Sequence, residues 1–370
     1  MLTRRGFAVQ GFAGMMAAGL TEAVFAQRAS VKGVAPADTV WLNGNEYPEG
    51  PPAPSVAAMA KIIGSSNRYH YQEFPAFYSA VAAYEKLDAD QVLIGAGSTE
   101  VIHAAIEAFT GPNRAFITAW PTFEAGPELA AYKGFPVVKT PLTSSGAPDV
   151  RRLVAEAEKA GGGMIYICHP NNPTSVLTTR ADMDWMVANL PKNTILLVDE
   201  AYLHYGTSPD AVSAMKYVHE GKDVIVTRTY SKIYAMAGLR AGFVAGRADL
   251  IKKMEPYRNN VISIVAVRAV LAALDLGPKL LEERRAKIDH TRAELCAWLK
   301  SKNIAFIPPQ ANFLMLDVKR DVREVAPQLL EKGVAVGRPF PPMDQMMRVT
   351  IGTDAEMRKF RSALSETLAV

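Results

Sequence analysis

The chain contains little cysteine and histidine, which limits the metal chemistry open to it. Its 370 residues include 2 cysteines and 6 histidines. Two isolated cysteines cannot form a structural zinc site, and the histidines lack the helical spacing of the zinc proteases, so we expect no metal. Cys168 lies within an apolar run, where a thiol usually behaves as a small buried hydrophobe, and we expect no disulfide with Cys296.

A large excess of charge of one sign is also lacking. The formal net charge is +4, and no long cluster of lysine and arginine concentrates it. We therefore expect no nucleic-acid partner. A G-x-x-x-x-G-K-[ST] loop is absent as well, which excludes a Walker-type ATPase even though an apolar run ends in Asp199-Glu200.

The long hydrophobic run is confined to the N-terminus. The stretch from Ala8 to Phe25 contains one charge, Glu22, and it lies between Thr3-Arg-Arg-Gly-Phe7 and the small residue Ala26. This pattern resembles a twin-arginine export signal, so we expect residues 1–26 to be a signal peptide and the protein to be periplasmic or exported. An amphipathic surface helix is the alternative, and without a working signal the protein would be cytoplasmic. No later segment reaches the roughly 18 apolar residues of a membrane span.

The remainder of the chain has the pattern of an α/β protein. Its length exceeds the usual limit for one hydrophobic core, so two subdomains around a shared site are expected. Short apolar runs alternate with helical patterns, which predicts a largely parallel sheet covered by helices on both faces. The expected strands are 91–94, 115–118, 164–168, 194–198, 224–227 and 241–245.

Beyond Arg247 the pattern changes to that of a smaller α+β unit. Helices are expected at 249–274, 280–300 and 321–332, and strands at 304–307, 313–316, 334–337 and 347–351. We therefore divide the chain into the signal peptide (1–26), an N-terminal arm (27–65), a large ligand-binding domain (66–247) and a small C-terminal domain (248–370).

Five candidate site residues follow expected strands: Ser98, Phe123, Asn172, Asp199 and Lys232. In open α/β sheets, ligands bind beyond the carboxyl ends of the strands. Lys232 and Asp199 together predict pyridoxal phosphate (PLP) chemistry, because a lysine amine can hold this cofactor as a Schiff base while a carboxylate keeps its pyridine nitrogen protonated. A single lysine is more often an exposed surface amine, so the prediction depends on the combination.

Other residues have the chemistry to hold the remaining parts of this cofactor. Backbone amides of Ser98 and Thr99, at an expected helix start, can bind a phosphate, although an N-cap at Ser98 is a compatible alternative. Glu100 replaces the third glycine of a dinucleotide loop, which excludes that fingerprint. Ser231 and Arg240 can bind the same phosphate.

The substrate side is less distinctive in sequence. Tyr202 and Asn172 can donate to the phenolic oxygen of the cofactor, although Asn172-Pro173 taken by itself is more typical of an ordinary turn. Phe123 is suited to stacking on the pyridine ring, with core packing as the alternative. Arg348 can bind a carboxylate through two parallel hydrogen bonds, or it can form a surface ion pair.

Taken together, the motifs resemble those of the class I/II aminotransferases, which are fold-type I PLP enzymes, and most closely the histidinol-phosphate aminotransferase branch. The matching segments are 42–48, 67–69, 97–100, 121–123, 171–174, 199–202, 231–232, 237–240, 311–313 and 348–352. The resemblance implies a seven-stranded, mostly parallel sheet between helices, followed by the smaller domain. It also implies a homodimer with shared active sites.

The resemblance further implies a role for each site residue. Lys232 would form the Schiff base, Asp199 would pair with the ring nitrogen, and Tyr202 and Asn172 would hold the phenolic oxygen, with Phe123 stacked on the ring. The residues expected around the phosphate are Ser98, Thr99, Ser231, Arg240 and, from a partner subunit, Tyr69. The residues expected on the substrate side are Arg348, Arg338, Tyr47 and Asn312.

Two departures from the family pattern affect the expected substrate. Ser175 replaces the usual glycine, which matters only if this position needs a positive φ. The segment before Arg348 is shorter than in histidinol-phosphate enzymes. We expect an aminotransferase that acts on an L-amino acid, or on histidinol phosphate, with a 2-oxo acid such as 2-oxoglutarate. An aromatic donor is favoured, and a PLP-dependent decarboxylase or lyase is the alternative.

Overall fold

The structure is a computed structural model, and it describes residues 35–258 and 261–369. The expected signal peptide lies outside these residues. Among the residues described, no helix is both long enough and apolar enough to span a membrane.

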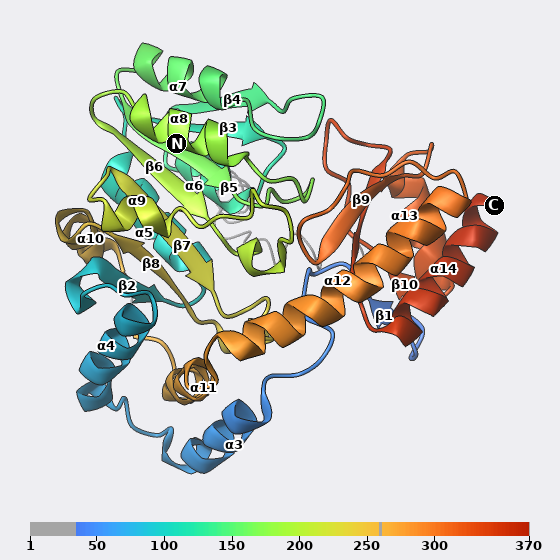
Figure 1. The fold of residues 1–370 in the computed structure, drawn as a ribbon, viewed down its shortest axis with the longest axis horizontal. Coiled ribbons are helices and arrows are strands. Elements are labelled where there is room, and N and C mark those ends of the chain that lie inside the picture. Colours follow the sequence, from blue (N-terminus) through green and yellow to red (C-terminus); the bar gives the residue numbers. More distant parts are fainter. Residues whose placement is uncertain (1–34, 259–260, 370) are drawn as a thin grey trace, which may run out of the picture.

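A central sheet organises the larger part of the molecule (Figure 1). In the described chain it has seven strands, in the order β2-β8-β7-β6-β5-β3-β4. Its strands are β2 (Val92–Gly95), β3 (Ala115–Trp120), β4 (Val137–Pro141), β5 (Gly163–Cys168), β6 (Thr194–Asp199), β7 (Val224–Thr229) and β8 (Gly242–Gly246). Only β8 runs antiparallel to its neighbours, so the expectation of a mostly parallel α/β sheet is confirmed.

The central strands are buried because their side chains are apolar on both faces. Every residue of β5 is buried, and β6 has a single partly exposed position. Edge strand β4 was missed, since it contains the exposed Lys139 and lacks a continuous apolar run. The helices associated with this sheet are α4 (Phe74–Tyr84), α5 (Ser98–Phe109), α6 (Ala125–Tyr132), α7 (Val150–Lys159), α8 (Arg180–Ala188), α9 (Met215–His219) and α10 (Ala248–Met254).

The C-terminal part forms the smaller α+β unit, on the right in Figure 1. Antiparallel strands β9 (Phe313–Asp317) and β11 (Met346–Thr350) pair there. An N-terminal strand, β1 (Val40–Trp41), pairs in parallel with β10 (Val334–Ala335), so the start of the described chain belongs to this unit. Its helices are α12 (Gly277–Ser301), α13 (Val322–Glu331) and α14 (Asp354–Leu368).

Two helices connect the parts. Helix α3 (Ala53–Ile62), within the expected arm, packs against α11 (Ile264–Leu274) (Figure 1). Helix α10 follows the expected boundary at Arg247, yet it packs on α5 and on the large sheet. Short 3₁₀ helices complete the described elements, at Ile63–Ser65, Tyr71–Glu73, Ala89–Gln91, Leu203–Tyr205, Ala237–Leu239 and Glu255–Tyr257.

Two expected elements of the C-terminal part are wrong. The helix expected over 249–274 is interrupted after α10, where Pro256 lies in a 3₁₀ turn and Ser263 caps the start of α11. Proline lacks the N–H that a continuous helix would need. The strand expected at 304–307 is reduced to one isolated bridge between Phe306 and Leu316.

Candidate functional site

Lys232 lies just beyond the carboxyl end of β7, as expected. Its Nζ donates a hydrogen bond to the carbonyl of Gly44 at 3.0 Å and lies 5.4 Å from the centre of the Tyr202 ring. The turn before it is held by Thr229, whose hydroxyl donates to the Ser231 hydroxyl at 2.9 Å. The amine therefore faces the ring that sequence analysis assigned to the same site.

Asp199 is the last residue of β6 and is 2% exposed. Its Oδ2 accepts a hydrogen bond from the Tyr166 hydroxyl at 2.9 Å, and its Oδ1 accepts one from the Ala201 N–H at 3.1 Å. Burial and the nearby Asp199 carboxylate raise the pKa of Tyr166 well above its usual value, so this hydroxyl stays a donor. Tyr166 is a site residue that the sequence motifs did not indicate, although its polar hydroxyl in an otherwise apolar strand was a usable signal.

A cradle suited to a phosphate lies where α5 begins, among Gly97, Ser98, Ser231 and Arg240. Arg240 Nη1 donates to the Ser231 hydroxyl at 3.1 Å. Gly97 has φ +82°, and a Cβ there would collide with the Arg240 guanidinium. A Cβ on Gly242 would approach the backbone nitrogen of Ser98 to 2.5 Å. The chains approach this closely only because these positions are glycines.

The N-cap interpretation of Ser98 is wrong. Gly97 is the N-cap residue of α5, without a side-chain capping bond, while Ser98 is the first helical residue and Thr99 the second. Their amides lie in the first turn, where helix N–H groups have no partner within the helix. This arrangement is suited to binding an anion.

Arg348 approaches Asn172 from the small unit. Its Nη1 donates to Asn172 Oδ1 at 2.5 Å, and its Nη2 donates to the Asn43 carbonyl at 2.8 Å. Both side chains are nearly fully buried, at 4% and 2% exposure. The surface ion-pair alternative for Arg348 is therefore wrong, because the guanidinium points into the seam between the sheet and the C-terminal unit.

The N-terminal segment from Asn43 to Tyr47 crosses this seam and contributes more than sequence analysis assigned to it. Asn45 Nδ2 donates to the Tyr202 hydroxyl at 3.1 Å, and Asn312 Nδ2 donates to the Asn45 carbonyl at 3.1 Å. Asn312 Oδ1 is buried and has no hydrogen-bond partner among the described residues. It is thus a buried acceptor at the site.

Three further residues expected at the site, Tyr47, Phe123 and Tyr69, differ from one another in what surrounds their side chains. The Tyr47 ring lies 4.5 Å from the Arg284 guanidinium, and burial raises the pKa of Tyr47 to about 12. Phe123 is buried, at 8% exposure. Tyr69 is 67% exposed and stacks on Tyr71 with ring centres 5.0 Å apart, so within this chain it does not join the site.

Arg338 joins the site indirectly. Its guanidinium forms an ion pair with Glu124, the residue after Phe123. It also lies 4.1 Å from the centre of the Phe340 ring, while Arg348 lies 4.8 Å from the same ring. The two arginines therefore share one aromatic side chain.

A buried ionic cluster supports the sheet beside Asp199. Arg228, on β7, donates to Glu85 at 2.7 Å and to Glu200 at 2.9 Å. Burial, as the largest influence, raises the pKa of Glu85, against the opposing effect of Arg228. The cluster ties the ends of β6 and β7 together, and these strands carry Asp199 and Lys232.

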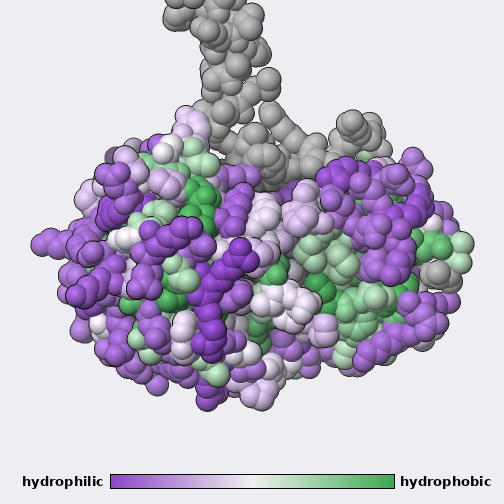
Figure 2. Space-filling view, turned by 90° about the horizontal axis from the view of Figure 1, so that it is seen from above, coloured by the Kyte–Doolittle hydropathy of each residue, from purple (hydrophilic) through white to green (hydrophobic). Residues whose placement is uncertain are grey.

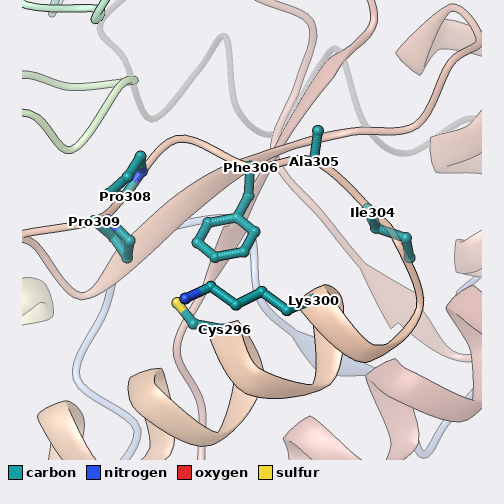
Figure 3. Close-up of a pocket in the computed structure, with 7 residues that line it drawn as sticks. All are labelled: Cys296, Lys300, Ile304, Ala305, Phe306, Pro308 and Pro309. Atoms are coloured by element: carbon teal, nitrogen blue, oxygen red, sulfur yellow. The ribbon is translucent and has the colours of Figure 1, made fainter.

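An open pocket of about 470 Å³ lies elsewhere, on the small unit (Figure 3). It is lined by α12 residues Cys296 and Lys300 and by the chain from Ile304 to Pro309, with the Phe306 ring directed toward that helix. Burial raises the pKa of the Cys296 thiol, which keeps it protonated and weakly nucleophilic. No disulfide joins Cys168 and Cys296.

Figure 2 shows one face, where hydrophilic residues predominate and hydrophobic ones form smaller patches. Among residues 35–258 and 261–369, no group of three or more His, Cys, Asp or Glu side chains could hold a metal ion.

The residues at the strand ends fit PLP. The buried Asp199 carboxylate, with its two donors, matches the ring nitrogen of the cofactor. The Lys232 amine, which faces the Tyr202 ring, matches the aldehyde, and the cradle bounded by glycines at the start of α5 matches the phosphate. Fold and site together define a PLP-dependent enzyme of the α/β class.

Comparison with known proteins identifies the family. The family model "Aminotransferase class I and II" matches residues 37–364, and the chain belongs to this family. It is 33% identical to a histidinol-phosphate aminotransferase of Symbiobacterium thermophilum, covering 90% of this chain and 91% of that protein. It is 31% identical to an aromatic amino acid aminotransferase of Cutibacterium acnes, covering 90% and 93% respectively.

A solved structure shows the same fold. Histidinol-phosphate aminotransferase from Sinorhizobium meliloti, in complex with pyridoxal 5'-phosphate, superimposes with a TM-score of 0.85 at 22% identity, over 96% of each chain. The protein is a PLP-dependent aminotransferase, and the expectations of fold class, enzyme class and cofactor are confirmed.

Proposed function

We propose that this aminotransferase exchanges an amino group between an L-amino acid with a non-phosphorylated, preferably aromatic, side chain and a 2-oxo acid such as 2-oxoglutarate. The main support is the position of Arg348, whose buried guanidinium lies against Asn172 and beside the Phe340 ring. A guanidinium there suits an α-carboxylate, and the adjacent ring suits an apolar side chain.

The bound PLP supplies an electron sink for the carbanion formed at the substrate α-carbon. Asp199 would hold the proton on the ring nitrogen, and Tyr202 and Asn172 would hold the phenolic oxygen, while Phe123 would pack against the ring. Ser98, Thr99, Ser231 and Arg240 would bind the phosphate. Lys232 would hold the aldehyde carbon of the cofactor through its Nζ, and the same amine would move the proton of the substrate α-carbon.

On the substrate side, Arg348 binds the α-carboxylate, and Asn312 offers its buried Oδ1. Tyr47 and Arg338 line the remaining wall. A decarboxylase or lyase on the same scaffold is the second candidate, and no residue of the site favours it.

The experiment is a panel of half-reactions. Purified PLP-loaded protein is mixed with single amino acids, and the loss of the visible absorbance of the lysine-bound cofactor is followed together with the oxo acid and carbon dioxide released. Oxo acid without carbon dioxide is expected, and it should be fastest with an aromatic donor. Turnover by Lys232→Ala near the wild-type rate would refute the proposal, and stoichiometric carbon dioxide would favour the decarboxylase.

We also propose a homodimer in which Tyr69 reaches the phosphate of the partner's site. In support, several large apolar side chains are exposed on and near α3: Val56, Ile63, Tyr69 and Tyr71. Light scattering should give twice the monomer mass of 40.1 kDa. A monomer that remained fully active would refute this proposal.

We further propose that residues 1–26 form a twin-arginine-type signal directing export. The support is the sequence pattern alone, since these residues lie outside the described chain. A reporter fused to residues 1–30 should reach the periplasm, whereas the same fusion with Arg4→Lys and Arg5→Lys should remain in the cytoplasm. Equal export of both fusions would refute the proposal.

A further inference from the structure

The ion pair between Arg338 and Glu124 connects two separate parts of the chain at the substrate side. Glu124 directly precedes α6 on the large sheet, whereas Arg338 lies between β10 and β11 of the small unit. Their side chains are 15% and 13% exposed, so the pair is largely removed from water. An ion pair at this burial is stronger than one on the surface, because the solvent screens it less.

The surrounding loop holds Arg338 near the group that binds the substrate carboxylate. The Phe340 ring, which is 2% exposed, lies 4.1 Å from the Arg338 guanidinium and 4.8 Å from that of Arg348. Trp120 Nε1 donates to the Pro341 carbonyl at 3.1 Å, which fixes the loop to the end of β3. A substrate side chain that lies along the Phe340 ring, with its carboxylate on Arg348, would meet Arg338.

The charge that such a side chain meets depends on Glu124. Arg338 alone would attract a phosphate ester, since a guanidinium binds phosphate through two hydrogen bonds. With Glu124 bound, the pair has no net charge, and its carboxylate oxygens repel a dianion. Like charges brought together in a binding site suppress the wrong partner.

We propose that Glu124 is a specificity-determining residue that neutralises Arg338 and so excludes amino donors whose side chain ends in a phosphate. Neutral aromatic donors can still pack against the Phe340 ring, and they need no positive charge from Arg338. This inference rests on the proposed aminotransferase function. It names Glu124 as the residue, and its negative charge as the cause, of part of the donor preference.

The test compares two donors in the half-reaction. L-phenylalanine and O-phospho-L-homoserine, whose side chain ends in a phosphate, are each mixed with PLP-loaded wild type, Glu124→Gln and Glu107→Gln. Glu107 is the matched control, because its carboxylate pairs with Lys133 Nζ at 2.6 Å away from the loops that form the site. The measured quantity is the ratio of the second-order rate constants for phenylalanine and phosphohomoserine.

We expect Glu124→Gln to shift this ratio at least ten-fold toward phosphohomoserine and Glu107→Gln to leave it unchanged. In an Arg338→Met background, Glu124→Gln should shift the ratio much less, because the cation it would unmask is gone. An unchanged ratio in Glu124→Gln, or an equal shift in the Arg338→Met background, would overturn the inference while leaving the proposed function intact. No oxo acid from any donor would instead defeat the proposed function.

If Glu124→Gln does not fold, the wild-type protein still tests the inference. Spectral titration of the loaded protein should show 3-phenylpropanoate binding at least ten-fold more tightly than 3-phosphonopropanoate. Both carry the carboxylate for Arg348, and they differ at the end that faces Arg338. Tighter binding of the phosphonate would overturn the inference.

Discussion

At the scale of single residues, the hydrogen bonds of Asp199 decide how well it can hold a cationic ring nitrogen. The carboxylate is buried on β6, and its donors come from the next strand, through Tyr166, and from its own chain, through the Ala201 N–H. A buried carboxylate needs such donors to remain ionised. Tyr166 is thus a positioning residue that acts through Asp199.

Replacing Tyr166 by Phe should weaken the hydrogen bonding of Asp199 without leaving a cavity in the core. A hydrogen bond to a charged group contributes about 1.5–3 kcal/mol, so the half-reaction should slow about ten-fold or more. The pH dependence of the visible absorbance of bound PLP should also shift, because the carboxylate that faces the ring nitrogen loses a donor.

The matched control is Tyr205→Phe. The Tyr205 hydroxyl is also fully buried, but it has no hydrogen-bond partner in the described chain. Its removal should leave both the rate and the absorbance profile unchanged. Equal effects of the two variants would show that Tyr166 acts only through packing.

At the scale of elements, loops from different parts of the chain are joined by buried hydrogen bonds. Ser175 has φ +63°, so this position requires the left-handed backbone that glycine adopts most easily. Serine in place of the usual glycine therefore costs backbone conformational energy here. Its hydroxyl accepts the N–H of Gln310 at 3.0 Å and that of Ala311 at 2.7 Å. Ser175 therefore joins the loop of Asn172 to the segment that carries Asn312.

Replacing Ser175 tests that junction. In Ser175→Ala the Ala311 N–H loses its partner, while the Gln310 N–H keeps the Ser175 carbonyl at 2.8 Å, so we expect a loss of about 1–3 kcal/mol in the free energy of unfolding. Ser175→Gly loses the same bond but relieves the backbone strain, and it should be about 1 kcal/mol more stable than the alanine variant.

Urea unfolding gives the stabilities, and hydrogen exchange at the Ala311 amide reports the junction directly. Exchange should accelerate in both variants. Slow, wild-type exchange at Ala311 in Ser175→Ala would contradict the assigned role.

At the scale of the whole molecule, the partly buried His204 and the buried His169 couple stability to pH. Burial, followed by the charges of Arg228 and Arg285, lowers the pKa of His204 to about 3. Burial also lowers the pKa of His169, which is 1% exposed. The unfolded chain binds these protons near pH 6.5, whereas the folded protein does not.

The free energy of unfolding should therefore decrease as the pH falls below about 6.5, and the contribution of His204 should be fully lost only near pH 3. Between pH 7 and pH 5, His204 alone should account for about 2 kcal/mol. Urea unfolding at both pH values measures this, and His204→Gln should reduce the difference by about that amount. His290→Gln, at an exposed position on α12, should not; a full difference retained in His204→Gln would contradict the prediction.

Much of the fold was predictable because it depends on local patterns. Apolar runs located six of the seven strands, and the strand-end rule brought Ser98, Asn172, Asp199 and Lys232 to one edge of the sheet. The missed strand β4 and the interrupted helix before α11 depend on edge exposure and on Pro256. The roles of individual site residues stay predictions until the variants are measured.

The sequence by itself determined the α/β class, the family and the reactive pair Lys232 and Asp199, because strand periods and motif spacings are encoded within a few residues. Only the tertiary structure decided which distant groups meet: Arg348 and Asn172 are 176 positions apart, and Glu124 and Arg338 come from different units. Such contacts depend on how the small unit packs against the sheet. Packing sums many weak interactions along the whole chain, so no local pattern records its outcome.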